Sequence, residues 1–242
     1  MYMSTEEEER LLTMDAADLS MMQLSDSFFP TGMYSMSNGL EAIFYGGNKK
    51  MKTGQLRDII TTYIDYQIGP ADCAALGNAY EQAAKSNLPK LLEVDRTIFS
   101  MKLVQEIRDA SVRSGTQLVR CIRSFSDNEI LTQYEDAIRG GRAYGSYPVA
   151  LALGANALSI PKRKAALMML YSFSVSIVGA ALRLGMLQHF DGQKVIDELK
   201  PTILKVVKEN INRPLKGIWQ FAPQIDIIQI SHERMSSKMF IT

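Results

Sequence analysis

Apolar side chains recur at helical spacing along most of this chain, and this periodicity limits the folds that it can adopt. The stripe from Leu56 to Gln67 follows the i, i+3, i+4, i+7 rule, which places residues on one face of a helix. Further stripes run from Val104 to Phe125 and from Ile196 to Val207, the last of them despite Pro201. Such stripes predict helices that pack on other helices.

Short groups of helix-breaking residues separate these stripes. They are Gly46-Gly47-Asn48, Gly69-Pro70, Ser126-Asp127-Asn128, Gly140-Gly141, Ser159-Ile160-Pro161 and Arg213-Pro214. None is long and no internal repeat occurs, so the sequence predicts one compact all-α domain of about ten helices over residues 16–242. We expect residues 1–15 to be disordered and the C-terminal tail to be mobile. Only Ile225 to Ile230 alternates in polarity, which is too short to predict a sheet.

Composition excludes several classes of partner. Lys and Arg total 27 against 26 Asp and Glu, so a net charge of +1 gives no broad field for nucleic acid or an anionic membrane. Cys73 and Cys121 lack CxxC spacing, which favours reduced thiols in the core of a cytoplasmic protein. The acidic run from Glu6 to Glu9 is the opposite of a signal peptide's basic start, so no signal peptide is expected.

One segment must be tested against a membrane interpretation. Ala165 to Leu182 is a run without charge, near the minimum length of a membrane-spanning helix. Arg183 ends the run, Ser172, Ser174 and Ser176 interrupt it, and the mean hydropathy of the chain is −0.06. These features favour a helix buried inside a globular protein, and a membrane anchor is the alternative.

Signatures of nucleotide enzymes are missing from the sequence. Neither GxxxxGK[ST] nor GxGxxG occurs, and no GxSxG motif surrounds a serine. The nearest segment is Gly140 to Ser146, where Arg139 and Arg142 could reach a phosphate or carboxylate of a partner. The same segment is typical of a turn between helices, and we favour that interpretation.

Histidine is too scarce to build a zinc site by itself, because His189 and His232 are the only two. His232 and Glu233 begin an HExxH pattern, but Ser236 occupies the position of the second histidine. We therefore predict no catalytic residues, no metal site and no cofactor. The alternative is a small helical metal- or nucleotide-dependent enzyme that uses His189, His232 and Glu233.

Turn-forming residues are dense between Gln23 and Glu41, after which the pattern becomes helical. Asp26 can cap a helix, Pro30 and Gly32 favour a turn, and Tyr34 adds aromatic surface just beyond it. From composition alone this segment is either a binding surface or a loop that leads into a helix with Tyr34 in the core.

The stretch DSFFPTGMYSMSNGLE, Asp26 to Glu41, resembles the N-terminal signature of the UreF family of urease accessory proteins, DSxxPxGxxxxSxGLE in outline. EIRDASVRSG, Tyr147-Pro148-Val149, and Ala181 with Arg183-Leu184 and Gln188 agree in order. The ending FAPQIDIIQISHERMSSKMF, Phe221 to Phe240, is similar to the closing pattern of the family. Lys238 and Met239 replace the Arg-Leu of the usual tail, which keeps the charge but loses the guanidinium fork. The resemblance covers about residues 20–242.

The resemblance implies a non-catalytic, all-helical chaperone of nickel-dependent urease that forms a homodimer in the cytoplasm. It implies a bridge between the accessory protein UreD, also called UreH, and the GTPase UreG, in an assembly that loads nickel onto apo-urease. In such an assembly GTP hydrolysis and nickel binding belong to the GTPase, which agrees with the missing phosphate loop. Neither nucleic acid nor a membrane is an expected partner.

Binding energy at such surfaces concentrates in a few anchors. The predicted partner-binding residues lie in the signature, at the end of the apolar run and in the tail, and they are Tyr34, Ser37, Leu40, Glu41, Arg183, Lys238, Met239 and Phe240. We expect the tail to be exposed in the free protein and to insert into the UreD-like partner, unless Phe240 packs on its own core. Arg183 and the loop arginines either contact the GTPase or, for Arg183, stabilise the end of its helix.

Overall fold

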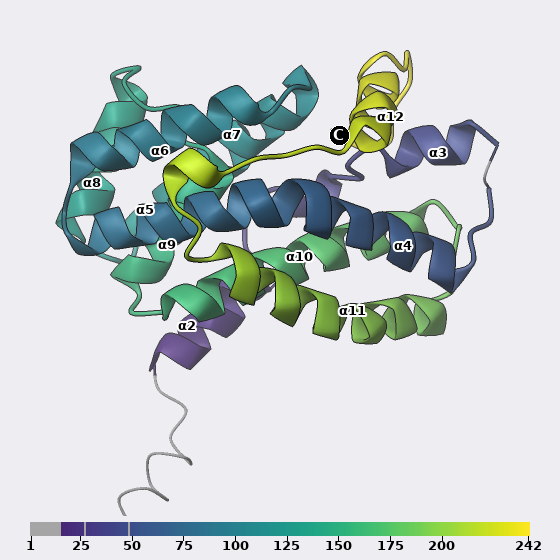
Figure 1. Cartoon of the computed structure of the whole chain (residues 1–242), viewed down its shortest axis with the longest axis horizontal. Coiled ribbons are helices and arrows are strands. Elements are labelled where there is room, and N and C mark those ends of the chain that lie inside the picture. Colours follow the sequence, from purple (N-terminus) through teal and green to yellow (C-terminus); the bar gives the residue numbers. More distant parts are fainter. Residues whose placement is uncertain (1–15, 27, 48) are drawn as a thin grey trace, which may run out of the picture.

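A computed structural model describes residues 16–26, 28–47 and 49–242, and all its regular structure is helical (Figure 1). The α-helices are α2 (Ala16–Ser25), α3 (Leu40–Tyr45), α4 (Thr53–Tyr63), α5 (Ala74–Ala84), α6 (Leu88–Met101), α7 (Gln105–Arg123), α8 (Glu129–Arg139), α9 (Tyr147–Ala157), α10 (Lys162–Arg183), α11 (His189–Asn210) and α12 (Pro223–Glu233). Two 3-10 helices, η1 (Met33–Ser35) and η3 (Leu215–Gly217), and the π-helix η2 (Ile64–Cys73) complete the order. The all-α prediction is confirmed, and no described residue forms a strand. The prediction for residues 1–15 lies outside the described residues.

Helix α10 contains the charge-free run of the sequence, and it lies at the centre of the fold. It packs against α11, α9, η1, η2 and α2. Its length and composition would suit a membrane span, but 61% of its most apolar window is buried within the protein. The prediction of a buried core helix is therefore confirmed.

The Gly69-Pro70 pair does not end a helix as predicted, because α4 continues through the π-helix η2 into α5. Pro70 has no N–H to donate, and the wider turn of a π-helix accommodates that loss. The carbonyls of Tyr66 and Pro70 accept the N–H groups of Phe221 at 2.9 Å and Trp219 at 3.3 Å. The extended segment before α12 is thereby fixed along this long helix (Figure 1).

The glycine-rich turn between α8 and α9 is held by a buried carboxylate. Asp95 of α6 accepts the N–H groups of Tyr144 at 2.6 Å, Gly145 at 3.2 Å and Ser146 at 2.9 Å. The Phe99 ring stacks on Tyr144 with 3.6 Å between ring centroids. The segment is thus the interhelical turn that the sequence favours, with a backbone fixed from below.

Gly115 of α7 touches this turn, and its substitution gives a first prediction. A Cβ at Gly115 would lie 2.1 Å from the carbonyl oxygen of Gly145. Gly115→Ala is expected to lower the free energy of unfolding by about 3 kcal/mol, because the backbone of the turn must move to make room for the Cβ. In the control Gly179→Ala, a Cβ would meet only Arg183 Nη2 at 3.9 Å, and a gain of about 0.5–1 kcal/mol is expected. Urea denaturation measures both changes, and equal shifts would contradict the close packing of α7 on the turn.

The two cysteines are free thiols in different surroundings. Cys73 is buried in η2, and burial raises the pKa of its thiol to about 12, so it packs as an apolar residue. Cys121 is only partly buried, at the edge of α7. The core prediction is therefore confirmed for Cys73 and only partly met for Cys121.

Candidate partner-binding site

The C-terminal residues of the described chain lie against a segment from its N-terminal part. We call residues 28–41 the signature segment and residues 234–242 the tail. Ser37 donates its N–H and its hydroxyl to the main-chain oxygen of Thr242, at 2.7 and 2.6 Å. The N–H of Ile241 donates to the carbonyl of Ser35 at 2.9 Å. The tail is therefore fixed along the signature segment by its backbone.

Glu41, in the first turn of α3, holds the tail through its carboxylate. Its side chain is fully buried; Oε1 accepts the N–H of Met239 at 2.7 Å and Oε2 accepts the N–H of Phe240 at 3.1 Å. Gly39 brings α3 against α12, because its φ is +91° and a Cβ there would lie 2.9 Å from Ile228 Cγ2. This close approach explains the glycine of the NGLE sequence.

His232 of α12 is fully buried between two carboxylates from different helices. Its Nε2 lies 3.0 Å from Oε2 of Glu41, and its Nδ1 lies 2.7 Å from Oε2 of Glu106, in the first turn of α7. Oε1 of Glu106 accepts a hydrogen bond from Lys238 Nζ at 2.7 Å. The backbone N–H of Glu106 donates to Glu233 Oε2 at 3.1 Å. This network joins α3, α7, α12 and the tail.

Arg183, at the end of α10, packs on the tail from the other side. Its guanidinium carbon lies 4.5 Å from the centroid of the Phe240 ring, a cation–π arrangement. Its Nε donates to the carbonyl of Gly179 at 3.1 Å. Phe240 is only 3% exposed as a result. These contacts favour the structural interpretation of Arg183, in which it stabilises its own helix end.

The structure brings together five of the eight predicted partner-binding residues: Ser37, Glu41, Arg183, Lys238 and Phe240. Leu40 is buried in the core beside them, Met239 is 63% exposed, and the side chain of Tyr34 lies outside the described part of the chain. The expectation of an exposed, mobile tail is wrong for Phe240, because Glu41 satisfies the tail amides and Arg183 covers the ring. Packing of Phe240 on its own core, the alternative, is what the structure shows.

Sequence reasoning missed Glu106 and treated His232 as a candidate metal ligand or catalytic residue. His189 is exposed at the start of α11, while His232 is buried and Glu233 accepts a backbone N–H, so the three do not form an active site. In the described residues no group of three His, Cys, Asp or Glu side chains is placed to hold a metal. Glu106 begins the EIRDASVRSG segment, which resembles the family, and this was the signal in the sequence that could have identified it.

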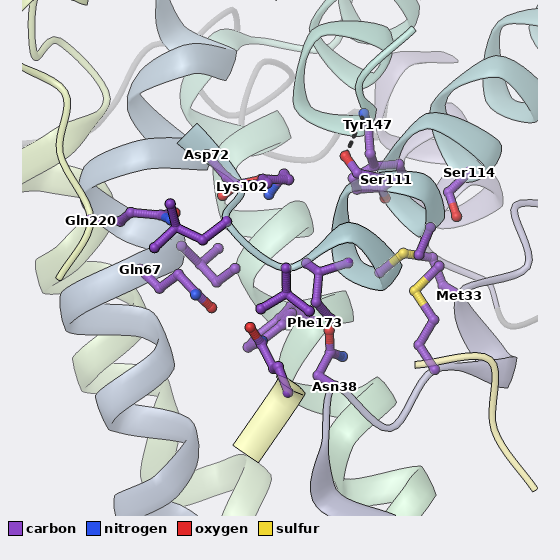
Figure 2. Close-up of a pocket in the computed structure, with 17 residues that line it drawn as sticks. Met33, Asn38, Gln67, Asp72, Lys102, Ser111, Ser114, Tyr147, Phe173 and Gln220 are labelled. Carbon is purple, nitrogen blue, oxygen red and sulfur yellow. Dashed lines mark hydrogen bonds and ion pairs between the residues drawn. The ribbon is translucent and has the colours of Figure 1, made fainter. Parts of the chain in front are cut away.

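A cavity of about 70 Å³, lined by both apolar and polar side chains, lies beside the signature segment (Figure 2). Asn38 and Met33 of that segment line it, together with Gln67 and Asp72 of η2. Asp72 forms a buried ion pair with Lys102 at 2.8 Å across its wall. Substrate pockets usually enclose about 300–1,000 Å³, so this cavity has room for a few water molecules and not for a substrate.

Large apolar side chains are exposed on α12 and on the tail, two of the elements that the network joins. On α12 these are Ile227, 63% exposed, and Ile230, 38% exposed; on the tail they are Met239, 63%, and Ile241, 46%. Ile227 and Ile230 are three residues apart and so share one side of the helix. We call these four residues the α12–tail face. The polar groups of the network thus have hydrogen-bond partners within the chain, whereas large apolar groups nearby are exposed. These are features of a helical protein that works by binding other proteins.

Comparison with known proteins identifies the family. The family model UreF matches residues 51–200. The urease accessory protein UreF of Trichodesmium erythraeum is 30% identical, over 92% of this chain and 95% of the relative. UreF 1 of Brucella melitensis is also 30% identical, over 92% of each chain, and UreF of a Bacillus species is 28% identical over 93% of this chain and 98% of its own. The chain belongs to the UreF family, which confirms the resemblance and the prediction that it is not an enzyme.

Proposed function

We propose that this chain binds a UreD-like accessory protein, a UreG-like GTPase and apo-urease in the cytoplasm, and so promotes nickel insertion into urease. Its relatives are named urease accessory proteins, which supports the connection to urease. The observation that carries the binding role is the α12–tail face, where four large apolar side chains stand on a fixed backbone.

The α12–tail face suits the UreD-like partner because it is organised before binding. Ser37 donates to the tail backbone and Glu41 accepts from it, so little conformational entropy remains to be lost when Met239 and Ile241 are covered. The flexible thioether of Met239 can adapt to a partner surface. Lys238, paired with Glu106, lies at the edge of this face. Ser37, Leu40 and Glu41 therefore support the face from beneath.

For the GTPase, the surface that we propose is the glycine-rich turn. Arg142 is exposed there, and its N–H donates to the carbonyl of Ala137 at 2.8 Å. Arg139, in contrast, pairs with Glu135 at 2.6 Å, and Arg183 covers Phe240. An arginine supplied to a GTPase can stabilise charge in the transition state. Equal rates of GTP hydrolysis with this chain and with its Arg142→Ala variant would contradict such a role.

For the homodimer that the family implies, the surface that we propose is a groove between α2, α10 and α11. The groove has a volume of about 610 Å³ and is almost wholly apolar. Met22 of α2, 54% exposed, and Leu204 of α11, 48% exposed, both line it. Covering these apolar side chains on association is favourable, which supports a second copy of this chain as the occupant of the groove. The molar mass by light scattering, for this chain and for Leu204→Glu, tests the assignment.

The direct test of the proposed function is co-purification. The tagged chain is co-expressed with urease, the UreD-like protein and the GTPase, and the proteins that elute with it are identified. We expect the UreD-like protein to co-elute, and to be lost when Lys238–Thr242 is deleted. An unchanged complex after that deletion, measured by size-exclusion chromatography, would contradict the role of the tail.

A further inference from the structure

An exposed aromatic ring lies on a fixed backbone at the glycine-rich turn. Tyr144 is 41% exposed, and its N–H donates to the buried carboxylate of Asp95 at 2.6 Å. One face of its ring stacks on Phe99, with 3.6 Å between the ring centroids and 6° between the planes. Arg108 also packs on Phe99, because its guanidinium carbon lies 5.3 Å from the centroid of that ring. Tyr144 is therefore held in place before a partner covers it, and little side-chain entropy is lost on binding.

Four exposed arginines border this ring. They are Arg96 of α6, Arg113 and Arg120 of α7, and Arg142 of the turn. Arg96 and Phe99 are three residues apart and so share one side of α6. Arg113 and Arg120 lie three residues before and four residues after Thr116, and so share one side of α7 with it. Thr116 itself touches the turn, because a Cβ at Gly145 would lie 2.7 Å from its hydroxyl oxygen. We call Tyr144 and these four arginines the arginine face.

The arginine face carries an excess of positive charge. Among the described residues, none of its four guanidinium groups forms an ion pair with a carboxylate. Carboxylates close by on α6 and α8 are engaged with other cations, in the pairs Glu93–Lys90 at 2.7 Å and Glu135–Arg139 at 2.6 Å. Asp109 and Asp136 are exposed without such a partner in the described chain, and so is Glu129, at the other end of α8 from the turn. The whole chain has a net charge of +1, so this excess is local.

Unpaired guanidinium groups around an aromatic ring fit a partner surface that carries carboxylates. A guanidinium group binds a carboxylate through two parallel N–H donors, and Tyr and Arg are enriched among the residues that carry binding energy. We propose that the arginine face binds an acidic surface of the UreG-like GTPase. This rests on the proposed function, in which the glycine-rich turn contacts the GTPase, and it adds the chemistry of that contact. Nucleic acid is the other class of acidic partner, but a net charge of +1 gives no broad field to hold its phosphates.

The position of the arginine face leaves the α12–tail face free. Helix α8, which leads into the glycine-rich turn, lies at the opposite end of the molecule from α12 (Figure 1). The GTPase and the UreD-like protein can therefore be bound at the same time. Because exposed charges attract over a distance, the four arginines should act mainly on the rate of encounter with the GTPase, and the Tyr144 ring on the lifetime of the complex.

Association rates measured by stopped flow test the proposal, with the purified GTPase mixed with the full chain, alone and in complex with the UreD-like protein. Raising NaCl from about 50 to about 500 mM should slow association of the wild type about tenfold, because salt screens the attraction. The double variant Arg113→Glu, Arg120→Glu should associate about tenfold more slowly at low salt and lose most of the salt dependence. Tyr144→Ala, which keeps its backbone N–H to Asp95, should raise the dissociation rate about tenfold.

The control Lys205→Glu, Lys208→Glu makes the same change of charge at exposed positions of α11, and should alter the association rate less than about twofold. Urea denaturation checks that each variant is folded, and the salt dependence of the wild type decides alone if a variant is not. Salt-independent association, equal in the wild type and in Arg113→Glu, Arg120→Glu, would overturn the arginine face while the GTPase stayed a partner. No binding of the GTPase to the wild type would overturn both. Binding of a mixed-sequence RNA oligonucleotide in place of the GTPase, lost in the double variant, would assign the face to nucleic acid and overturn the proposal.

Discussion

Glu41→Ala is expected to lower the free energy of unfolding by about 3–5 kcal/mol and to release the tail. The substitution leaves the N–H groups of Met239 and Phe240 without their acceptor. It also leaves the ring of His232 fully buried without one of its two carboxylates. Each orphaned donor costs about 1–3 kcal/mol unless water replaces the lost contact. The loss should appear in urea denaturation, and tail release should appear as a changed Met239 methyl signal.

The matched control is Glu209→Ala, which removes a carboxylate exposed on α11. It is expected to change the free energy of unfolding by less than about 0.5 kcal/mol. Glu41→Gln is the informative intermediate, because it keeps one acceptor oxygen and loses the charge. If Glu41→Ala were as stable as Glu209→Ala, the carboxylate would not hold the tail, and the account of the site would be wrong.

The double variant Ile227→Asp, Met239→Asp is expected to lose capture of the UreD-like protein while keeping its fold. Both side chains are 63% exposed, so the free energy of unfolding should change little. At a binding face, anchors of this kind contribute about 2 kcal/mol each, which corresponds to roughly thirtyfold in Kd for each substitution. Titration of the purified UreD-like protein onto the immobilised chain measures the loss.

Phe190→Asp serves as the comparison for this double variant. Phe190 is 84% exposed at the start of α11, so it tests whether any exposed apolar residue matters. We expect Phe190→Asp to bind the partner as the wild type does. Equal loss in both variants would show a general effect of charge, and equal binding in both would exclude the α12–tail face as the contact.

The helices could be predicted from the sequence because their causes are local. Apolar spacing marks α4, α7 and α11. A polar residue that can cap marks a start, as where Asn128 precedes α8 and accepts the N–H of Leu131 at 3.1 Å. The predicted helix end at Gly69-Pro70 was wrong because distant backbone contributes to the π-helix there. The N–H groups of Trp219 and Phe221 donate to carbonyls of this helix. The short apolar pattern at Ile225 to Ile230 became helix α12, which periodicity over so few residues does not decide.

The site could be predicted in part. Motifs at both ends of the chain identified Ser37, Glu41 and the tail, but not that they meet. Glu41 and His232 are 191 residues apart, and polar residues carry no periodic signal that would pair them. The tail was expected to be mobile because terminal segments have few contacts. That expectation did not include the buried carboxylate of Glu41, which accepts two backbone N–H groups of the tail at once.

The central claim is that this chain supports nickel insertion into urease through the proteins that it binds. The most direct measurement is the nickel content and activity of urease purified from cells that express the urease subunits, the UreD-like protein and the GTPase, with and without this chain. The account predicts nickel-loaded, active urease only when the chain is present, and nickel-poor urease when it is absent or carries the Ile227→Asp, Met239→Asp pair. Equal nickel content and activity in the presence and absence of the chain would contradict it.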